Sequence, residues 1–326
     1  MKIFFRRPCG GEAVNPVMRQ VMTYPRVHSR KAFTVVELLV ILGLVFLIVA
    51  AWLPALAGSR SKAQGFRCLD NARQIVNAVM MYTHDNHDLL PPNPDDGTTL
   101  PGYTWCAGNA GIGSGDQFDP DLVIDPTRTL IAKYLGTNAS VFRCTADTRV
   151  GKYDGGAFYP NSPLIGKQVP AARTISMNHA VGTIDPGFSS GGGHSGIPNL
   201  PVNGPWLTGT HGVNNANTGP YRTYGKISQM VMPVPAQLNI MTEESPFSIN
   251  DGTCATCVST LNPEWIDYPS TLHNNGCVLS FADAHVELHK WVKSSLYFTV
   301  PVGITVVPPN DPDWVWFTQR TSARLR

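Results

Sequence analysis

The residues of this chain that could carry chemistry are its cysteines, histidines and aspartates. Seven cysteines are spread along the 326 residues: Cys9, Cys68, Cys106, Cys144, Cys254, Cys257 and Cys277. In an oxidising compartment cysteines usually pair as disulfide bonds, and an odd number of cysteines leaves one without a partner. Removal of a leader that holds Cys9 would leave six cysteines, which could form three disulfide bonds. We therefore expect disulfide chemistry in an exported body.

Two cysteine pairs are candidates for such bonds. A bridge between Cys68 and Cys144 would close a loop of about 75 residues and contribute about 4 kcal/mol in the chain-entropy model; two buried thiols are the alternative. Cys254 and Cys257 form an isolated Cys-x-x-Cys pattern. Because no second ligand pair and no βαβ context accompany this pattern, we expect a local disulfide or two separate bridges, not a zinc or redox site.

His273, Asp283 and His285 could supply an acid–base pair. No nucleophile pattern such as G-x-S-x-G accompanies them, so we predict no catalytic residue and no enzyme. Val278 to Phe281 and Val286 to Trp291 have the composition of strands joined by a tight turn. We therefore assign His273 and Asp283 to a structural role in a hairpin.

Two clusters of polar residues could bind a cation. The first, His84 to Asp88, follows a helical pattern and is interpreted as a solvated helix end. The second contains Asp116, Asp119 and Asp121 but lacks the EF-hand spacing, which favours an acidic surface turn over a Ca²⁺ loop. We predict no metal site and no cofactor, with Ca²⁺ at the second cluster as the alternative.

A long helix must position most of these groups. Leu38 to Ala57 is an uncharged run of about 30 Å as a helix, the thickness of a bilayer core. Ala63 to Thr83 is amphipathic, with apolar residues at three- and four-residue steps. The pattern predicts one helix from about Thr34 to Tyr82, kinked near Pro54.

The charge of the chain is distributed unevenly. Residues 1–32 hold seven basic residues and one acidic residue, a charge of +6, and the remaining 18 basic and 22 acidic residues give −4. Basic residues before a membrane span stay in the cytoplasm, which predicts a leader inside and a body outside. A mildly acidic body offers no electrostatic footprint for nucleic acid.

The block from Lys31 to Val40, Lys-Ala-Phe-Thr-Val-Val-Glu-Leu-Leu-Val, resembles the processing site of type IV prepilins and type II secretion pseudopilins. The resemblance implies that a prepilin peptidase cleaves between Ala32, where the family usually has glycine, and Phe33, and methylates the new amino terminus. It implies that Glu37 pairs with the ammonium group of a neighbouring subunit. Pro54 stands where many pilins have a helix-softening proline.

An ordinary secretory signal is the competing interpretation, because Ala55-Leu56-Ala57 matches an A-x-A cleavage pattern. Glu37 near the start of the apolar run argues against it. Further along, the spacing of His273 and Asp283 resembles the His-x9-Asp-Gly block of prepilin-like proteins that are abundant in planctomycete and verrucomicrobial bacteria, with Ala284 in place of the glycine.

Together these features predict an α+β, pilin-like fold: a long amino-terminal helix, half in the membrane and half amphipathic, packed on an antiparallel β-sheet with long loops. The expected segments are a cytoplasmic leader (1–32), a transmembrane assembly helix (33–57), its amphipathic continuation (58–90) and a β-rich periplasmic domain (91–326).

The expected function is that of a pilin-like structural subunit, a pseudopilin of a type II secretion system, held as a single-pass protein of the bacterial inner membrane. Its expected partners are prepilin peptidase, other pilin-like subunits and the inner membrane, and not nucleic acid. The alternative is a membrane-anchored periplasmic binding or hydrolytic domain that uses the helix only as a tether.

Overall fold

The structure, a computed structural model, describes residues 33–93, 102–156, 158–184, 201–213, 215–216, 218–293 and 296–325, and the side chains of 50–61 lie outside this description. The chain divides into two compact units, Met1–Leu53 and Pro54–Arg326, and each is described by itself. The predicted leader, with Ala32, lies outside the described residues.

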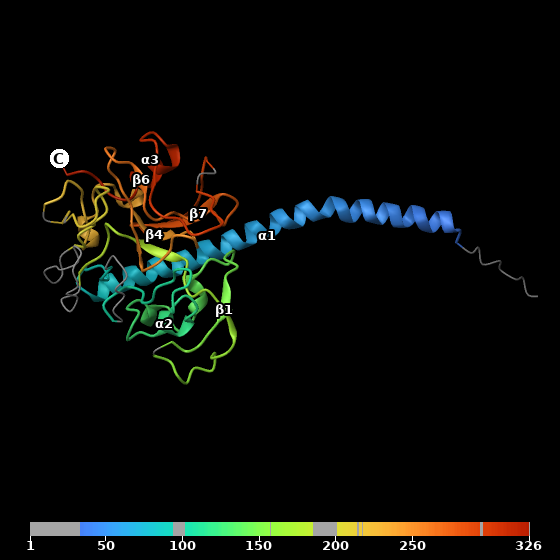
Figure 1. The fold of residues 1–326 in the computed structure, drawn as a ribbon, viewed down its shortest axis with the longest axis horizontal. Coiled ribbons are helices and arrows are strands. Elements are labelled where there is room, and N and C mark those ends of the chain that lie inside the picture. Colours follow the sequence, from blue (N-terminus) through green and yellow to red (C-terminus); the bar gives the residue numbers. More distant parts are fainter. Residues whose placement is uncertain are drawn as a thin grey trace, which may run out of the picture. The chain divides into compact units, whose positions relative to one another are not determined.

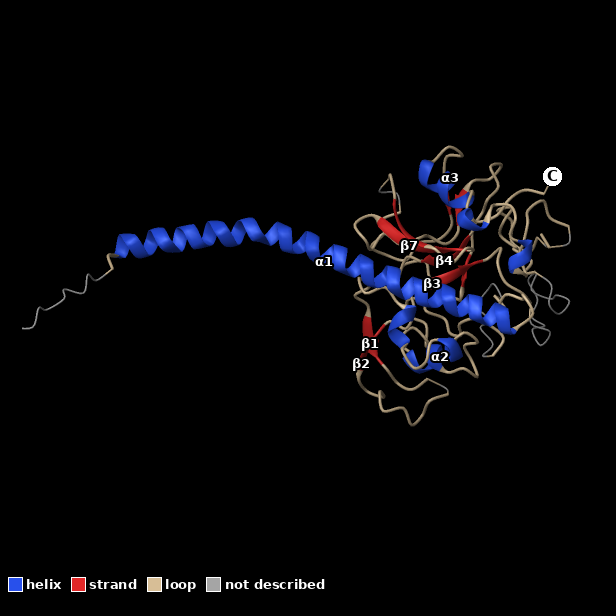
Figure 2. Cartoon of the chain, turned by 180° about the vertical axis from the view of Figure 1, so that it is seen from behind, coloured by secondary structure: helices blue, strands red, loops and turns tan. Residues whose placement is uncertain are grey.

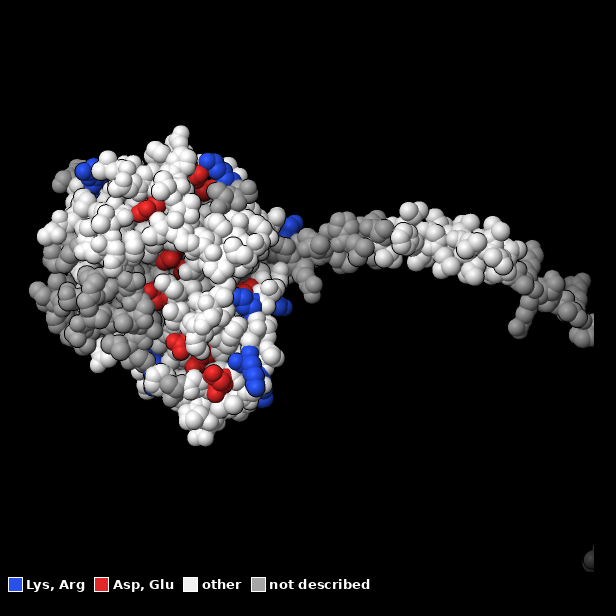
Figure 3. All heavy atoms as spheres, viewed as in Figure 1, with Lys and Arg blue, Asp and Glu red and all other residues white. Residues whose placement is uncertain are grey.

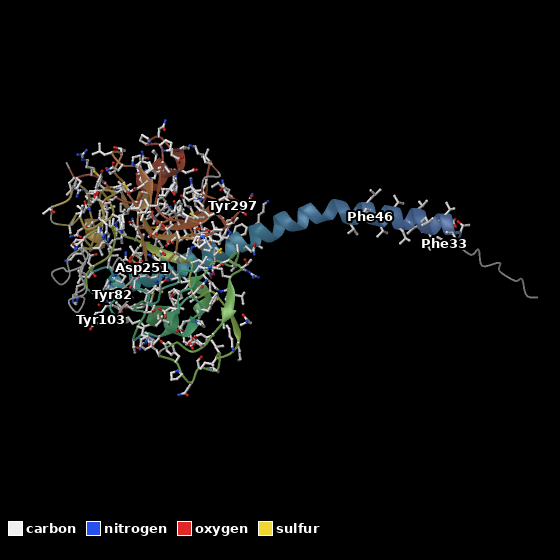
Figure 4. The ribbon with its side chains drawn as sticks, in the orientation of Figure 1. Phe33, Phe46, Tyr82, Tyr103, Asp251 and Tyr297 are labelled. Carbon is white, nitrogen blue, oxygen red and sulfur yellow. The ribbon has the colours of Figure 1, made fainter. Side chains whose placement is uncertain are left out.

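The described part of the first unit belongs to helix α1 (Val35–Asp85). A reciprocal capping box starts the helix: the Thr34 hydroxyl accepts from the backbone N–H of Glu37 (3.2 Å), and the Glu37 carboxylate accepts from the N–H of Thr34 (2.8 Å). Every described side chain from 33 to 49 is exposed. Figure 4 shows Phe33 and Phe46 among the side chains that radiate from this segment, and Figure 3 shows its outer surface as almost wholly uncharged.

Among the described residues, no helix is both long enough and apolar enough to cross a membrane. A span requires about 20 apolar residues, whereas the uncharged run with described side chains covers 38–49. The predictions of a transmembrane helix and of a single-pass inner-membrane location are therefore wrong, and so is the membrane half of the predicted pilin-like fold.

In the second unit, α1 is an amphipathic helix of the core. Its buried side chains recur at three- and four-residue steps on one face, at Cys68, Ala72, Ile75, Val76 and Val79. In Figure 1 this part of the helix lies beside the strands labelled β4 and β7. Asn86 follows the helix, and the backbone then takes positive φ angles at His87 and Asp88, which ends the helical run.

The main sheet of the described residues has the strand order β5-β3-β4-β7-β8. Its strands are β3 (Ile175–Asn178), β4 (Asn239–Glu243), β5 (Thr253–Cys254), β7 (Gly276–Phe281) and β8 (Val286–Lys290). Strand β4 pairs antiparallel with β3 and with β7, and β7 pairs antiparallel with β8, so the predicted hairpin is confirmed.

The pairing of β5 with β3 is parallel, so the sheet is mixed and the predicted antiparallel sheet is wrong. After β4 the chain crosses β3 and adds β5 at its far edge. Because β3 and β5 both run opposite to β4, they run parallel to each other. The parallel pairing depends on the connection between β4 and β5, residues 244–252. This connection has no periodic pattern that would predict on which side of β3 the chain returns.

The main sheet is covered on both faces. Alternate residues of β7 point to opposite sides: Val278 packs with Cys68 and Ala72 of α1, whereas Leu279 packs with Trp314 of α3 (Pro312–Thr318). Figure 2 shows α3 and this part of α1 on opposite sides of the strands. The side chains of β7 are buried along its length because both layers cover it.

The remaining elements are short and lie around this three-layer core. They are α2 (Pro120–Ile124), the 3-10 helices η1 (Ala132–Tyr134), η2 (Ala139–Phe142), η3 (Ile227–Gln229) and η4 (Pro235–Gln237), and the paired strands β1 (Val150–Lys152) with β2 (Gln168–Pro170) and β6 (Glu264–Trp265) with β9 (Thr305–Val306). Both pairs are antiparallel.

Candidate functional site

Four buried polar side chains meet between α1 and the main sheet. Cys68 comes from α1, Cys144 from the loop after η2, Glu243 from the end of β4 and His273 from the loop before β7. One ligand atom from each, two sulfurs, a carboxylate oxygen and an imidazole nitrogen, lies within 4.8 Å of the others. All four side chains are at most 4% exposed.

Short contacts join the four groups. The sulfurs of Cys68 and Cys144 are 3.5 Å apart. The Nε2 atom of His273 lies 3.3 Å from the Cys144 sulfur and 3.2 Å from Oε1 of Glu243. His273 is thus the centre of the cluster, with a thiol on one side and a carboxylate on the other.

Backbone groups hold the two sulfurs. The N–H of Thr145 donates to the sulfur of Cys68 (3.3 Å), and the N–H of Ala146 donates to the sulfur of Cys144 (3.3 Å). The backbone N–H of Cys144 itself donates to the hydroxyl of Thr174, which precedes β3. Donors directed at sulfur favour the thiolate form, because an N–H group stabilises negative charge.

The His273 loop is built by two consecutive left-handed residues. Asn274 and Asn275 have φ of 54° and 58°, a conformation that asparagine tolerates better than other side chains. The N–H of His273 donates to the carbonyl of Gly276 (3.1 Å), and the Lys290 ammonium donates to the carbonyls of His273 and Asn274. This tight turn fixes the position of the His273 imidazole between α1 and the main sheet.

Glu243 is the member of the cluster that sequence reasoning missed. Its Oε1 contacts His273, and its Oε2 accepts the N–H of Val278 (3.0 Å). Glu244 follows it and, because side chains alternate along a strand, accepts from Ser248 instead. The sequence did contain a signal for this residue, because two adjacent acidic residues end an apolar, strand-like run. An acidic side chain that is buried in such a strand requires a partner.

The contacts within the cluster determine its protonation. The hydrogen bond with Cys144, reinforced by His273, lowers the pKa of the Cys68 thiol in spite of burial, whereas burial and the same contact raise the pKa of Cys144. Burial alone would lower the pKa of His273, but hydrogen bonds with Cys68 and Glu243 raise it to about 10. The result is a thiolate at Cys68 next to an imidazolium at His273.

The space beside the cluster is small. A cavity of about 10 Å³ is lined by residues that include Asn71, Arg143 and Met241 together with the two cysteines. That volume accommodates roughly one water molecule or one ion.

His273 and Asp283 do not form a pair. They flank β7 on opposite sides in the sequence, and Asp283 accepts from the ring Nδ1 (2.5 Å) and the backbone N–H (3.1 Å) of His285 in the hairpin turn. Ala284 in that turn has φ of 67°. Each residue therefore fixes its own turn, one before β7 and one after it.

The second candidate cysteine pair is divided between two packing clusters. Cys254 packs with Cys277 and Trp265, whereas Cys257 packs with Ile266 and contacts the carbonyl of Asn262 (3.2 Å). Both are free thiols in the structure, as are Cys68 and Cys144. Burial raises the pKa of Cys254 and of Cys257, which keeps both thiols protonated.

The other predicted sites have local structural roles. Asp119 caps α2 by accepting from the N–H groups of Asp121 and Leu122, and Asp116 accepts from the N–H of Asn109. At the end of α1, Asp85 accepts from the hydroxyl of Tyr134 (2.7 Å).

Of the predicted processing and assembly residues, Phe33 is 73% exposed and Glu37 completes the capping box. Ala32 lies outside the described residues. Pro54 lies within α1, and its side chain is outside the description.

Comparison with known proteins adds no relative: the chain matches no family, no curated protein and no solved structure. The prediction of a type II secretion pseudopilin is therefore wrong in its transmembrane helix, and no similar protein supports that classification.

Proposed function

We propose that the protein is a pilin-like structural subunit that assembles with further copies of itself, or with similar subunits, through the first part of α1. The observation that carries this proposal is the exposed apolar surface of residues 33–49. Its large hydrophobic side chains are 44 to 73% exposed in the isolated chain.

Such a surface requires apolar surroundings. Burying one Leu, Ile, Val or Phe side chain contributes about 1.5–3 kcal/mol, and a helix that is apolar on all sides is stable only when it is buried. Neighbouring α1 helices supply apolar surroundings of matching shape, because ridges of side chains on one helix pack into grooves of another.

Glu37 limits how such helices pack. Its carboxylate is satisfied by Thr34 of the same chain, and this hydrogen bond lowers its pKa, so that the charge is present at neutral pH. A charge among packed helices is unfavourable without a counter-charge. The amino group that cleavage before Phe33 would create on a neighbouring subunit is such a counter-charge, and it would define the axial register.

The cleavage step is tested by mass spectrometry. The full chain is produced together with a prepilin peptidase, and the amino terminus of the product is determined. The proposal expects a methylated terminus at Phe33. An intact leader, or a terminus at Gly58, would overturn it.

The assembly step is tested by photo-crosslinking. A benzoyl-phenylalanine is placed at Phe46, and the matched control places it at Phe66; both native side chains are 72% exposed. The proposal expects a ladder of covalent multimers from position 46 and little from position 66. Adducts with detergent or lipid alone, or equal ladders from both positions, would contradict it.

A further inference from the structure

We infer that Cys68, Cys144, Glu243 and His273 form a structural zinc site that joins α1 to the main sheet. Two thiolates, one imidazole and one carboxylate are a ligand set that Zn²⁺ accepts in tetrahedral sites. The inference is independent of the proposed assembly, because none of these residues belongs to the first unit.

The spacing of the donor atoms fits a tetrahedral ion. Standard zinc–ligand bonds place two sulfurs about 3.8 Å apart, a sulfur and a nitrogen about 3.6 Å apart, and a nitrogen and an oxygen about 3.3 Å apart. In the cluster, the two sulfurs are 3.5 Å apart, the Cys144 sulfur is 3.3 Å from Nε2 of His273, and that nitrogen is 3.2 Å from Oε1 of Glu243. Each of these distances agrees to within about 0.3 Å with the separation expected for the same pair of ligand atoms.

The surroundings of the cluster also suit a metal. Thr145 and Ala146 direct backbone N–H groups at the two sulfurs, and Val278 directs one at the free carboxylate oxygen of Glu243. Such hydrogen bonds orient metal ligands and disperse their charge. Two thiolates, one carboxylate and Zn²⁺ sum to one negative charge, which these three donors and the nearby Arg143 stabilise.

A Cys68–Cys144 disulfide explains less of this arrangement. A disulfide is neutral and requires neither an imidazole nor a carboxylate within contact distance of the sulfurs. It would leave His273 and Glu243 as a buried polar pair without a function. Burial of such a pair is unfavourable unless further hydrogen bonds or charges compensate for the lost hydration. A divalent cation uses all four groups.

The direct test measures zinc in the full-length protein purified under reducing conditions in a mild detergent. The expected content is about one zinc per chain, because the cluster supplies the four ligands of a single tetrahedral ion. The Cys144→Ser variant should bind zinc at least about ten-fold more weakly, since a first ligand is lost. The control Cys106→Ser removes a buried thiol outside the cluster and should keep the zinc.

A measurement on the unaltered chain covers the case in which Cys144→Ser fails to fold. Co²⁺ added to the chelator-treated, reduced protein should produce thiolate-to-cobalt charge-transfer absorption and the intense visible bands of a tetrahedral site. Absence of these bands would overturn the inference. So would a Cys68–Cys144 disulfide detected by mass spectrometry in the protein as purified without reductant.

Discussion

The β7–β8 turn offers a stabilising substitution, Ala284→Gly. Ala284 has φ of 67°, and its N–H donates to the carbonyl of Phe281 (2.9 Å), so the turn cannot relax without losing that hydrogen bond. An L-residue in the left-handed region costs about 1–2 kcal/mol. Glycine avoids this cost but loses roughly 0.5–1 kcal/mol through its greater freedom in the unfolded chain. The net expectation is a gain of about 0.5–1 kcal/mol in the free energy of unfolding.

Thermal unfolding of the full chain in a mild detergent measures this effect. A gain of this size should raise the Tm by about 2 °C for a unit of this length. The matched control is Ala282→Gly in the same turn. Ala282 is buried and is not among the residues with positive φ, and its N–H donates to the carbonyl of Leu238 (2.9 Å). Glycine there should lower the Tm.

Two results would contradict this prediction: a lower Tm for Ala284→Gly, or Tm shifts of the same direction and size in both variants. Either result would mean that the backbone at 284 is not held in the left-handed region. The prediction does not depend on the metal or assembly proposals, because the turn uses neither the cluster nor the first part of α1.

Three further substitutions test other parts of the structure. Asp311→Ala should lower the free energy of unfolding by about 1 kcal/mol, because Asp311 caps α3. Hydrogen bonding lowers the pKa of Asp311 in spite of burial, so this contribution is present above the unfolded pKa and is lost as pH falls below about 4. Urea unfolding at pH 7 and at pH 3 measures the difference. Gly276→Ala should cost about 1–3 kcal/mol in the same assay, because a Cβ there would lie 2.4 Å from the backbone oxygen of His289. Glu37→Gln keeps the capping pattern with Thr34 but removes the charge, and should reduce multimer formation in the photo-crosslinking assay without lowering the helix content measured by circular dichroism; unchanged multimers would show that the charge has no part in assembly.

Several local features follow from the sequence alone. The three- and four-residue spacing of apolar positions identifies the face of α1 that is buried in the second unit, and alternating strands around Asp283-Ala284 identify the hairpin. These features depend on residues close in the chain or on the period of one element, which the sequence contains directly.

Tertiary structure decides the composition of the cluster. His273 has its nearest partner in Glu243, 30 residues earlier, and its second in Cys144, 129 residues earlier, not in Asp283 ten residues later. Strand period places Glu243 and Glu244 on opposite faces, but it does not say which face meets α1.

The same limit explains the sheet. The parallel β3–β5 pairing depends on which edge the chain reaches after β4, and 244–252 contain no pattern that specifies an edge. The sequence by itself determines which face of α1 is buried in the second unit, because that follows from the period of one helix. Only the packing of α1, β4 and the His273 loop determines that two thiols, an imidazole and a carboxylate come together, because that requires contacts between segments far apart in the chain.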